Sequence, residues 1–216
     1  KESLSKTITV EEKTAYDDLV TNIDKETQDL LVARIKSAFP TDNILAEEND
    51  MVHNIKDGNV WVLDPIDGTV NFIVQQDNFC VMIAYYEKGQ GKFGLIYNVM
   101  ADQLFYGGGQ FDVYCNDKLL SPYKRRPLDR CLVGSNAAMY AKNYHGIKGF
   151  IDKTLGVRVY GGAGISMSKV LSGQILAYFS VIYPWDYAAA SIMGKKLDYQ
   201  LETITGELLD YSSRQA

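Results

Sequence analysis

Two aspartates, Asp64 and Asp67, stand three residues apart where an apolar segment meets a turn signal. The stretch reads Trp61-Val-Leu-Asp-Pro-Ile-Asp-Gly-Thr69. Pro65 stiffens the backbone between the two acids, and Gly68 lets a ligand approach the main chain closely. Carboxylate oxygens are hard ligands suited to Mg²⁺, Mn²⁺ or Ca²⁺. The stretch therefore favours a divalent metal site, although Asp-Gly and Pro are also common in simple turns.

The residues after Asp67 provide groups that could bind an anion. A strand that leads through a glycine-containing loop into a helix offers free backbone N–H groups and the positive end of the helix dipole. Gly68 and Thr69 would supply these groups, and Thr69 is expected to cap the helix that follows. The segment thus predicts a metal ion and a phosphate group side by side.

The composition excludes several other classes of protein. The chain has 216 residues, of which 46% are hydrophobic, so it can bury a sizeable core. With 22 basic and 27 acidic side chains the formal charge is -5, which disfavours nucleic acid as a partner. No apolar run reaches the roughly 18 residues of a membrane span, so we expect no membrane insertion and a cytoplasmic location. Both ends of the chain are expected to be incomplete.

Cysteine and histidine offer no competing metal site. The three cysteines, Cys80, Cys115 and Cys131, are odd in number and irregularly spaced, which argues against disulfides and against a thiolate site. His53 and His145 do not have the spacing of a zinc site. A hard divalent cation held by carboxylates remains the better prediction.

Hydrophobic periodicity indicates the elements that must position these acids. The first part of the chain, 1–128, is expected to form a helix and an antiparallel meander in which the glycines at 107–109 make a hairpin loop. The second part, 129–216, is expected to alternate strands and helices as in α/β proteins. The predicted helices cover residues 21–39, 139–155, 161–172 and 185–197, and the predicted strands cover residues 60–63, 79–86, 92–99, 104–106, 113–115, 131–134, 157–160 and 176–182.

Four motifs in a fixed order resemble the inositol monophosphatase family of lithium-sensitive, magnesium-dependent phosphatases, in its bacterial form. They are Asp18-Leu-Val-Thr-Asn-Ile-Asp24, Glu47-Glu48, the Trp61 to Thr69 stretch with Asn71-Phe72, and Trp185-Asp186 before a helix of small residues. The resemblance implies one phosphatase unit over residues 1–216. It also implies an α+β fold, the layered α-β-α-β-α sandwich of inositol monophosphatase and fructose bisphosphatase, and a homodimer.

The same resemblance implies a site with two or three Mg²⁺ ions and no covalent nucleophile. The ions lower the pKa of the attacking water and stabilise the leaving oxygen. The implied catalytic residues are Glu47 and Thr69, the latter oriented by Asp24, and Glu48 supports the metal shell from behind. The implied metal ligands are Glu47, Asp64, the carbonyl of Ile66, Asp67 and Asp186.

The substrate that the resemblance implies is a myo-inositol monophosphate. Animal members carry a glutamate where this chain has Ser180, so NADP(H), fructose 1,6-bisphosphate and 3′-phosphoadenosine 5′-phosphate stay open as alternatives. A catalytically inactive relative that binds metal or a partner protein is the alternative of another class. The implied substrate loop, 161–163, is also consistent with a plain strand-to-helix turn. The implied substrate-binding residues are Asp67, Gly68, Thr69, Gly161, Gly162, Ala163 and Ser180.

Overall fold

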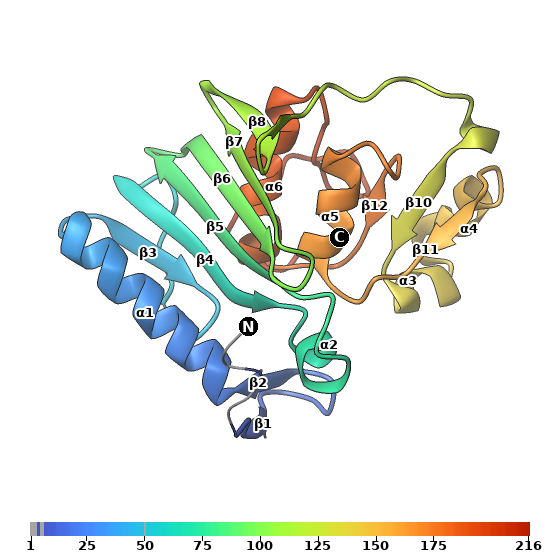
Figure 1. Cartoon of the computed structure of the whole chain (residues 1–216). Helices are drawn as coiled ribbons and strands as arrows, with labels where there is room; N and C mark the ends of the chain where they lie inside the picture. Colours follow the sequence, from blue (N-terminus) through green and yellow to red (C-terminus); the bar gives the residue numbers. More distant parts are fainter. Residues whose placement is uncertain (1–3, 5–6, 50) are drawn as a thin grey trace.

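Five layers of secondary structure stack across the molecule (Figure 1). The computed structural model describes residues 4, 7–49 and 51–216. Helix α1 (Asn22–Ala38) covers one face of a seven-stranded sheet, and α5 (Ala163–Leu171) and α6 (Pro184–Lys196) cover its other face. A three-stranded sheet follows, with α3 (Ala137–Ala141) and α4 (Ile147–Ile151) outside it. The fold is therefore mixed α+β, in the α-β-α-β-α order that the resemblance implied.

The seven-stranded sheet contains the predicted meander. Its strands lie in the order β3-β4-β5-β6-β7-β8-β9, and the pairs from β4 to β9 are antiparallel, whereas β3 and β4 are parallel. The glycine cluster joins β7 to β8, as predicted for a hairpin. The strands are β3 (Asn43–Ala46), β4 (Asn59–Asp67), β5 (Cys80–Glu87), β6 (Gln90–Asn98), β7 (Gln103–Gly108), β8 (Phe111–Cys115) and β9 (Lys118–Leu119).

Helix α6 packs closely on this sheet because both surfaces are made of small residues. Ala188, Ala189 and Ala190 are buried on the helix. On β6, a Cβ atom at Gly94 would lie only 2.3 Å from the carbonyl oxygen of Ala189. The small-residue helix predicted from the sequence is thus the element that brings Asp186 to the centre of the molecule.

The three-stranded sheet has the order β11-β10-β12 and is wholly parallel. Its strands are β10 (Leu132–Ser135), β11 (Gly156–Arg158) and β12 (Tyr178–Phe179). The strand predicted over 176–182 is therefore reduced to two residues. Beyond β12, Ile182 pairs with Gln215 in an isolated bridge. This part of the chain thus pairs with the C-terminal segment and no longer with β10.

The helix predicted over residues 139–155 is wrong. The segment forms α3, a 3-10 turn, η3 (Tyr144–Gly146), and α4. Asn143, His145 and Gly146 have φ angles of 50°, 48° and 77°, which lie in the left-handed region and interrupt an α-helix. Periodicity alone does not reveal such a break, because the apolar residues on each side keep a helical spacing.

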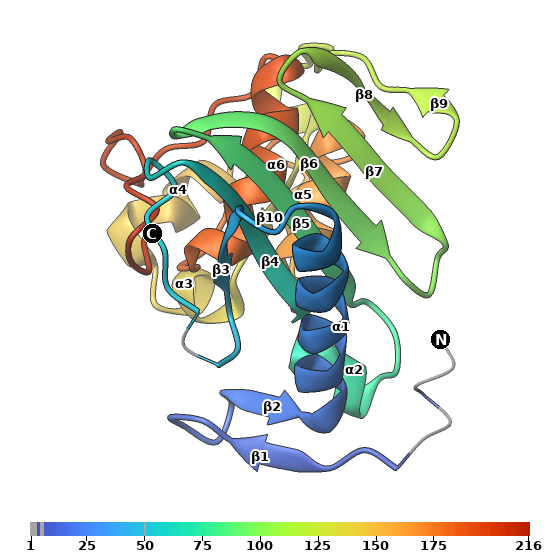
Figure 2. The same ribbon diagram turned by 90° about the vertical axis from the view of Figure 1, so that its left-hand side faces the viewer.

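The N-terminal part forms a hairpin that leads directly into α1 (Figure 2). Strands β1 (Val10–Glu12) and β2 (Leu19–Thr21) pair antiparallel. Thr21 caps α1, and Asp24 completes the capping box by accepting a hydrogen bond from the Thr21 backbone N–H at 3.0 Å. The helix therefore begins where its sequence predicted, with a buried acid in its first turn.

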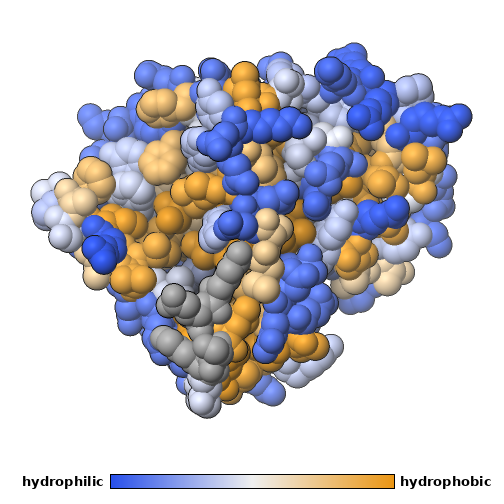
Figure 3. Space-filling view, in the orientation of Figure 1, coloured by the Kyte–Doolittle hydropathy of each residue, from blue (hydrophilic) through white to orange (hydrophobic). Residues whose placement is uncertain are grey.

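Hydrophobic and hydrophilic residues are unevenly distributed over the surface. On the face seen in Figure 3, hydrophilic side chains occupy much of the rim, and hydrophobic ones gather in the left-hand and central part. None of the helices in the described part of the chain combines the length and hydrophobicity needed to cross a bilayer. The division into 1–128 and 129–216 follows the two sheets, but α5 and α6 of the second part cover the first sheet, and a single phosphatase unit stays a prediction.

Candidate active site

Three carboxylates meet where β4 ends and α6 begins. One oxygen from each of Asp64, Asp67 and Asp186 lies within 4.8 Å of the others, and we call these residues the acidic triad. Residues three apart on a regular strand point to opposite faces. The pairing of β4 with β5 is irregular between Asp64 and Asp67, and such an irregularity lets both side chains reach one place. Asp64 and Asp67 thus converge because the end of β4 is distorted, and not because they stand in a loop.

The first turn of α6 fixes the third member of the acidic triad. Asp186 accepts a hydrogen bond from the backbone N–H of Tyr183 at 2.7 Å, and Pro184 occupies the first helical position. A carboxylate at this end also interacts favourably with the helix dipole. The Trp185-Asp186 motif therefore places an acid by ordinary capping of a helix.

Asp67 is held by the start of α5. Its carboxylate accepts hydrogen bonds from the backbone N–H groups of Ala163 and Gly164, both at 2.8 Å. Glycine is required close by, because a Cβ atom at Gly162 would lie 2.8 Å from Asp67 Oδ2. The turn predicted to face the substrate thus has a second task in this structure, which is to hold a carboxylate of the acidic triad. Gly164 was not singled out from the sequence.

Asn71 ties helix α2 (Thr69–Val74) to the same turn. Its side-chain amide donates hydrogen bonds to the carbonyls of Tyr160, at 2.8 Å, and Asn78, at 3.0 Å. A Cβ atom at Gly161 would lie 2.7 Å from the Asn71 side chain. The sequence predicts Asn71 only as part of a motif, two residues after Thr69.

In the described part of the chain, no basic side chain forms an ion pair with the acidic triad. Burial raises the pKa of Asp64 well above its usual range, and the charges of Glu47, Asp67 and Asp186 add to the effect. Burial also raises the pKa of Asp67 to about 6, against the two backbone N–H groups that lower it. Asp64 Oδ1 is the one buried side-chain oxygen or nitrogen among the described residues that has no hydrogen-bond partner. An orphaned oxygen among buried carboxylates fits a hard divalent cation such as Mg²⁺.

Glu47 and Glu48 follow β3 and contact a lysine. Lys13 Nζ lies 2.9 Å from Glu47 Oε1 and 2.5 Å from Glu48 Oε1. Burial raises the pKa of Glu47 to about 7, although Lys13 lowers it. Burial alone would lower the pKa of Lys13, but the two glutamates outweigh it and the pKa is raised. Glu47, a predicted metal ligand, is therefore paired with Lys13, which no sequence motif predicts as a site residue.

Thr69 and Asp24 come together as the resemblance implied. The Thr69 hydroxyl lies 3.1 Å from Asp24 Oδ1 and 3.1 Å from the carbonyl oxygen of Ile66, and it can donate to either. The expected capping by Thr69 is wrong. Gly68, with φ of 87°, is the N-cap of α2, and Thr69 is the first residue of the helix. Because Gly68 takes the N-cap position, the Thr69 hydroxyl does not cap the helix and bonds to Asp24 or Ile66 instead.

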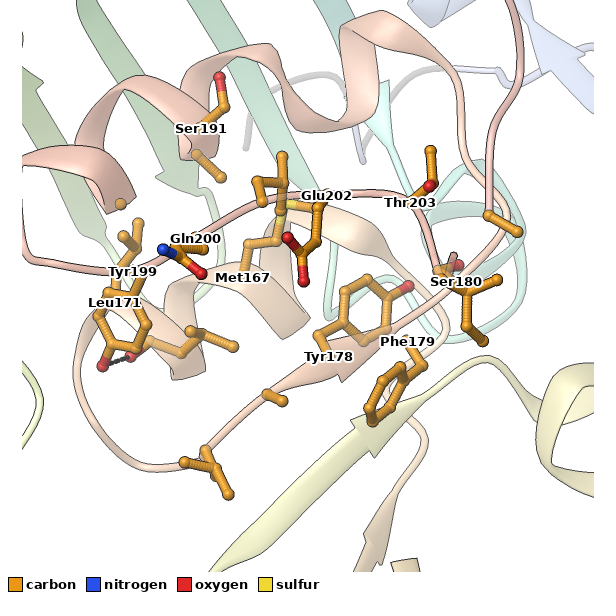
Figure 4. Close-up of a pocket in the computed structure, with 18 of the residues that line it drawn as sticks. Met167, Leu171, Tyr178, Phe179, Ser180, Ser191, Tyr199, Gln200, Glu202 and Thr203 are labelled. Carbon is orange, nitrogen blue, oxygen red and sulfur yellow. Dashed lines mark hydrogen bonds between the residues drawn. The ribbon is translucent and has the colours of Figure 1, made fainter. Parts of the chain in front are cut away.

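Ser180 lines a cavity of about 340 Å³ between α5, α6, β12 and the segment 199–204 (Figure 4). Tyr178 lines the same cavity, and burial raises its pKa to about 12. The acidic triad is not part of the cavity lining. A contact between Ser180 and the substrate stays a prediction.

The layered fold and the acidic triad, with Asp64 and Asp67 buried, are those of a phosphatase of the metal-dependent class. The chain belongs to the inositol monophosphatase family, whose model matches residues 1–216. It is 37% identical over 213 residues to an inositol-1-monophosphatase of Bacillus subtilis, an alignment that covers 95% of this chain and 80% of the relative.

Two further comparisons agree with this membership. A fructose-1,6-bisphosphatase/inositol-1-monophosphatase of Thermotoga maritima is 31% identical over 208 residues, which cover 96% of this chain and 77% of that protein. The crystal structure of an IMPase/NADP phosphatase with Mg²⁺ and phosphate superposes with a TM-score of 0.91 at 26% identity, and the match covers 99% of this chain and 82% of that one. The three relatives differ in the substrates that their names carry.

Proposed function

We propose that this protein hydrolyses myo-inositol monophosphate in a reaction that requires Mg²⁺. The observation that carries the proposal is the acidic triad with its orphaned Asp64 oxygen. The name of the Bacillus subtilis relative supports the substrate. Glu47, Asp64 and the carbonyl of Ile66 would hold one cation, and Asp64, Asp67 and Asp186 would hold a second. Bound Mg²⁺ supplies positive charge that lowers the pKa of water and neutralises the phosphoryl oxygens.

The residues of the chain orient the reactants. When the Thr69 hydroxyl donates its hydrogen to Asp24, its oxygen lone pairs are free to accept a hydrogen bond from the attacking water. Asp24 is well suited to this task because it is buried and fixed in the first turn of α1. Gly68 allows the phosphate to approach the backbone before α2. The hydrogen bonds from α5 keep the Asp67 carboxylate in position.

Other phosphate esters are the alternatives within the same class. Fructose 1,6-bisphosphate is supported by the name of the Thermotoga maritima relative, and NADP by that of the superposed crystal structure. 3′-Phosphoadenosine 5′-phosphate rests on resemblance alone. Phosphate release from all four substrates should be measured with the full chain in Mg²⁺. The highest kcat/KM for inositol 1-phosphate would support the proposal, and preference for a nucleotide or a bisphosphate would replace its substrate. No release from any of them would favour the inactive, binding relative.

Three finer features belong to the same proposal. Two or three Mg²⁺ ions are expected at the site, and the protein is expected to be a homodimer in the cytoplasm. These features rest on resemblance to the family. Isothermal titration with Mg²⁺ or Mn²⁺ would count the ions, and sedimentation equilibrium would give the oligomeric state.

A further inference from the structure

Lys13 extends from the hairpin turn between β1 and β2 toward the acids that follow β3. The turn is closed by backbone hydrogen bonds from Lys13 N–H to the Asp18 carbonyl at 2.8 Å and from Asp18 N–H to the Ala15 carbonyl at 2.9 Å. The β1 residues are exposed throughout. Lys13 therefore joins a hairpin on the outside of the molecule to the edge of the active site.

The ammonium group of Lys13 contacts Glu47 and Glu48 as a bound metal cation would. It lies between two carboxylate oxygens, at 2.9 Å from Glu47 and 2.5 Å from Glu48. The side chains of Lys13 and Glu47 are each 22% exposed and that of Glu48 is 6% exposed. At this degree of burial solvent screens the attraction less than it would on an open surface.

The acids are fixed more firmly than the lysine. The Gln28 side chain, fully buried in α1, accepts a hydrogen bond from the Glu48 N–H at 2.9 Å and donates one to the Glu48 carbonyl at 2.6 Å. The Glu47 N–H donates to the carbonyl of Leu63 on β4. The glutamate backbone is thus held by α1 and the sheet, whereas Lys13 stands beside a turn whose residues 14–17 are exposed.

We propose that Lys13 is a positioning residue that neutralises Glu47 and Glu48 in the metal-free protein and competes with the divalent cation for Glu47. Glu47 Oε1 accepts a hydrogen bond from the Lys13 ammonium group. The divalent cation can therefore bind this oxygen only when Lys13 moves away. Lys13 therefore stabilises the protein without metal and weakens its affinity for metal. The inference rests on the metal dependence in the proposed function, but it concerns binding and not the substrate.

The test compares Lys13→Met with Lys25→Met in the full chain. Lys25 is the matched control, because its Nζ pairs with Glu11 of β1 at 2.7 Å on the exposed side of the same hairpin. Mn²⁺ binding is measured by calorimetry and the melting temperature is measured in EDTA. Lys13→Met is expected to bind Mn²⁺ about tenfold more tightly, the size of one charge-assisted hydrogen bond, and to melt a few degrees lower without metal. Lys25 acts on Glu48 only through its charge and makes no contact with Glu47, so Lys25→Met should change both quantities much less than Lys13→Met.

A third variant separates charge from packing. Lys13→Arg keeps the positive charge and should restore the melting temperature and the weaker Mn²⁺ binding. Equal or weaker Mn²⁺ binding by a folded Lys13→Met, checked by circular dichroism, would overturn the role of Lys13 and leave the proposed function intact. Absence of Mn²⁺ binding by the wild-type protein would overturn both.

Discussion

Asp67 Oδ1 lies 2.8 Å from the backbone nitrogen of Ala163, so the last residue of β4 is fastened to the first residue of α5. Asp67 Oδ2 binds the next N–H, that of Gly164, in the same way. This contact joins the two parts of the chain at the acidic triad. The two hydrogen bonds also fix the position of the Asp67 carboxylate.

Replacing Asp67 by Asn should remove most of the activity while the protein stays folded. The change takes one negative charge from the proposed cation site, and we expect a loss of at least ~100-fold in phosphate release. In the metal-free variant the relief of repulsion with Asp186 opposes the loss of one of the two hydrogen bonds from Ala163 and Gly164, because the amide nitrogen of Asn cannot accept. Asp117→Asn, on an exposed turn, is the control for loss of a carboxylate. Near-normal turnover by a folded Asp67→Asn would contradict the metal site.

A methyl group at Gly162 should displace Asp67. The φ angle of Gly162 is -143°, so alanine is allowed by the backbone, but its Cβ would lie 2.8 Å from Asp67 Oδ2. We expect Gly162→Ala to lower kcat/KM by about tenfold or more, since small misplacements of catalytic groups are costly. Gly149→Ala is the matched control, because nothing lies within 4 Å of its Cβ. Equal activity of the two variants would show that the close approach does not matter.

The metal-free protein should lose stability as the pH rises from about 4 to 7. In the unfolded chain, aspartate and glutamate ionise near pH 4. In the folded protein the pKa is about 6 for Asp67 and about 7 for Glu47, so the folded state holds more protons across this window. The free energy of unfolding therefore decreases with rising pH. Thermal unfolding in EDTA at pH 5, 6, 7 and 8 measures this slope, and Mg²⁺ should reverse it. A flat or rising stability would count against it.

Lithium should inhibit the enzyme at millimolar concentration. Li⁺ is small and hard, so it competes for the carboxylate oxygens of Asp64, Asp67 and Asp186, yet it brings only half of the charge of Mg²⁺. Phosphate release should be followed while Na⁺ replaces Li⁺ at constant ionic strength. Indifference to lithium would mean that the cation site differs from that of the family.

Ser180→Glu should separate substrates by charge. If Ser180 faces the substrate, an added carboxylate repels esters with a second phosphate and can accept a hydrogen bond from an inositol hydroxyl. We expect kcat/KM for NADP⁺ or fructose 1,6-bisphosphate to fall several-fold more than that for inositol 1-phosphate, about the effect of 1 kcal/mol. An equal change for all substrates would place Ser180 away from the substrate, on the wall of the cavity alone.

Local rules in the sequence predicted those parts of the fold that depend on near neighbours. The capping residue Thr21, the apolar spacing of α1 and the small residues of α6 each act within a few positions, and both helices lie where they were expected. The break at Asn143, His145 and Gly146 was missed, because left-handed residues do not alter the apolar spacing that predicted the helix; Gly146 was the available signal.

The acids of the site were predicted, but the groups that hold them were not. Asp64 and Asp67 stand out by type and spacing. The partners of these acids and of Glu47 come from distant segments, as when Gly164 binds Asp67 or Lys13 binds Glu47. Contacts of this kind depend on how the layers of the fold stack on one another. A single sequence contains no local pattern that predicts this stacking.

The acidic triad also couples cation binding to the order in which the chain is made. Asp64 and Asp67 leave the ribosome early, but Asp186 follows only after both sheets have been synthesised. A nascent chain that stops before α6 has two of the three carboxylates of the acidic triad and lacks the third. A cation held by all three would therefore stabilise only a chain whose α6 has docked on the sheet.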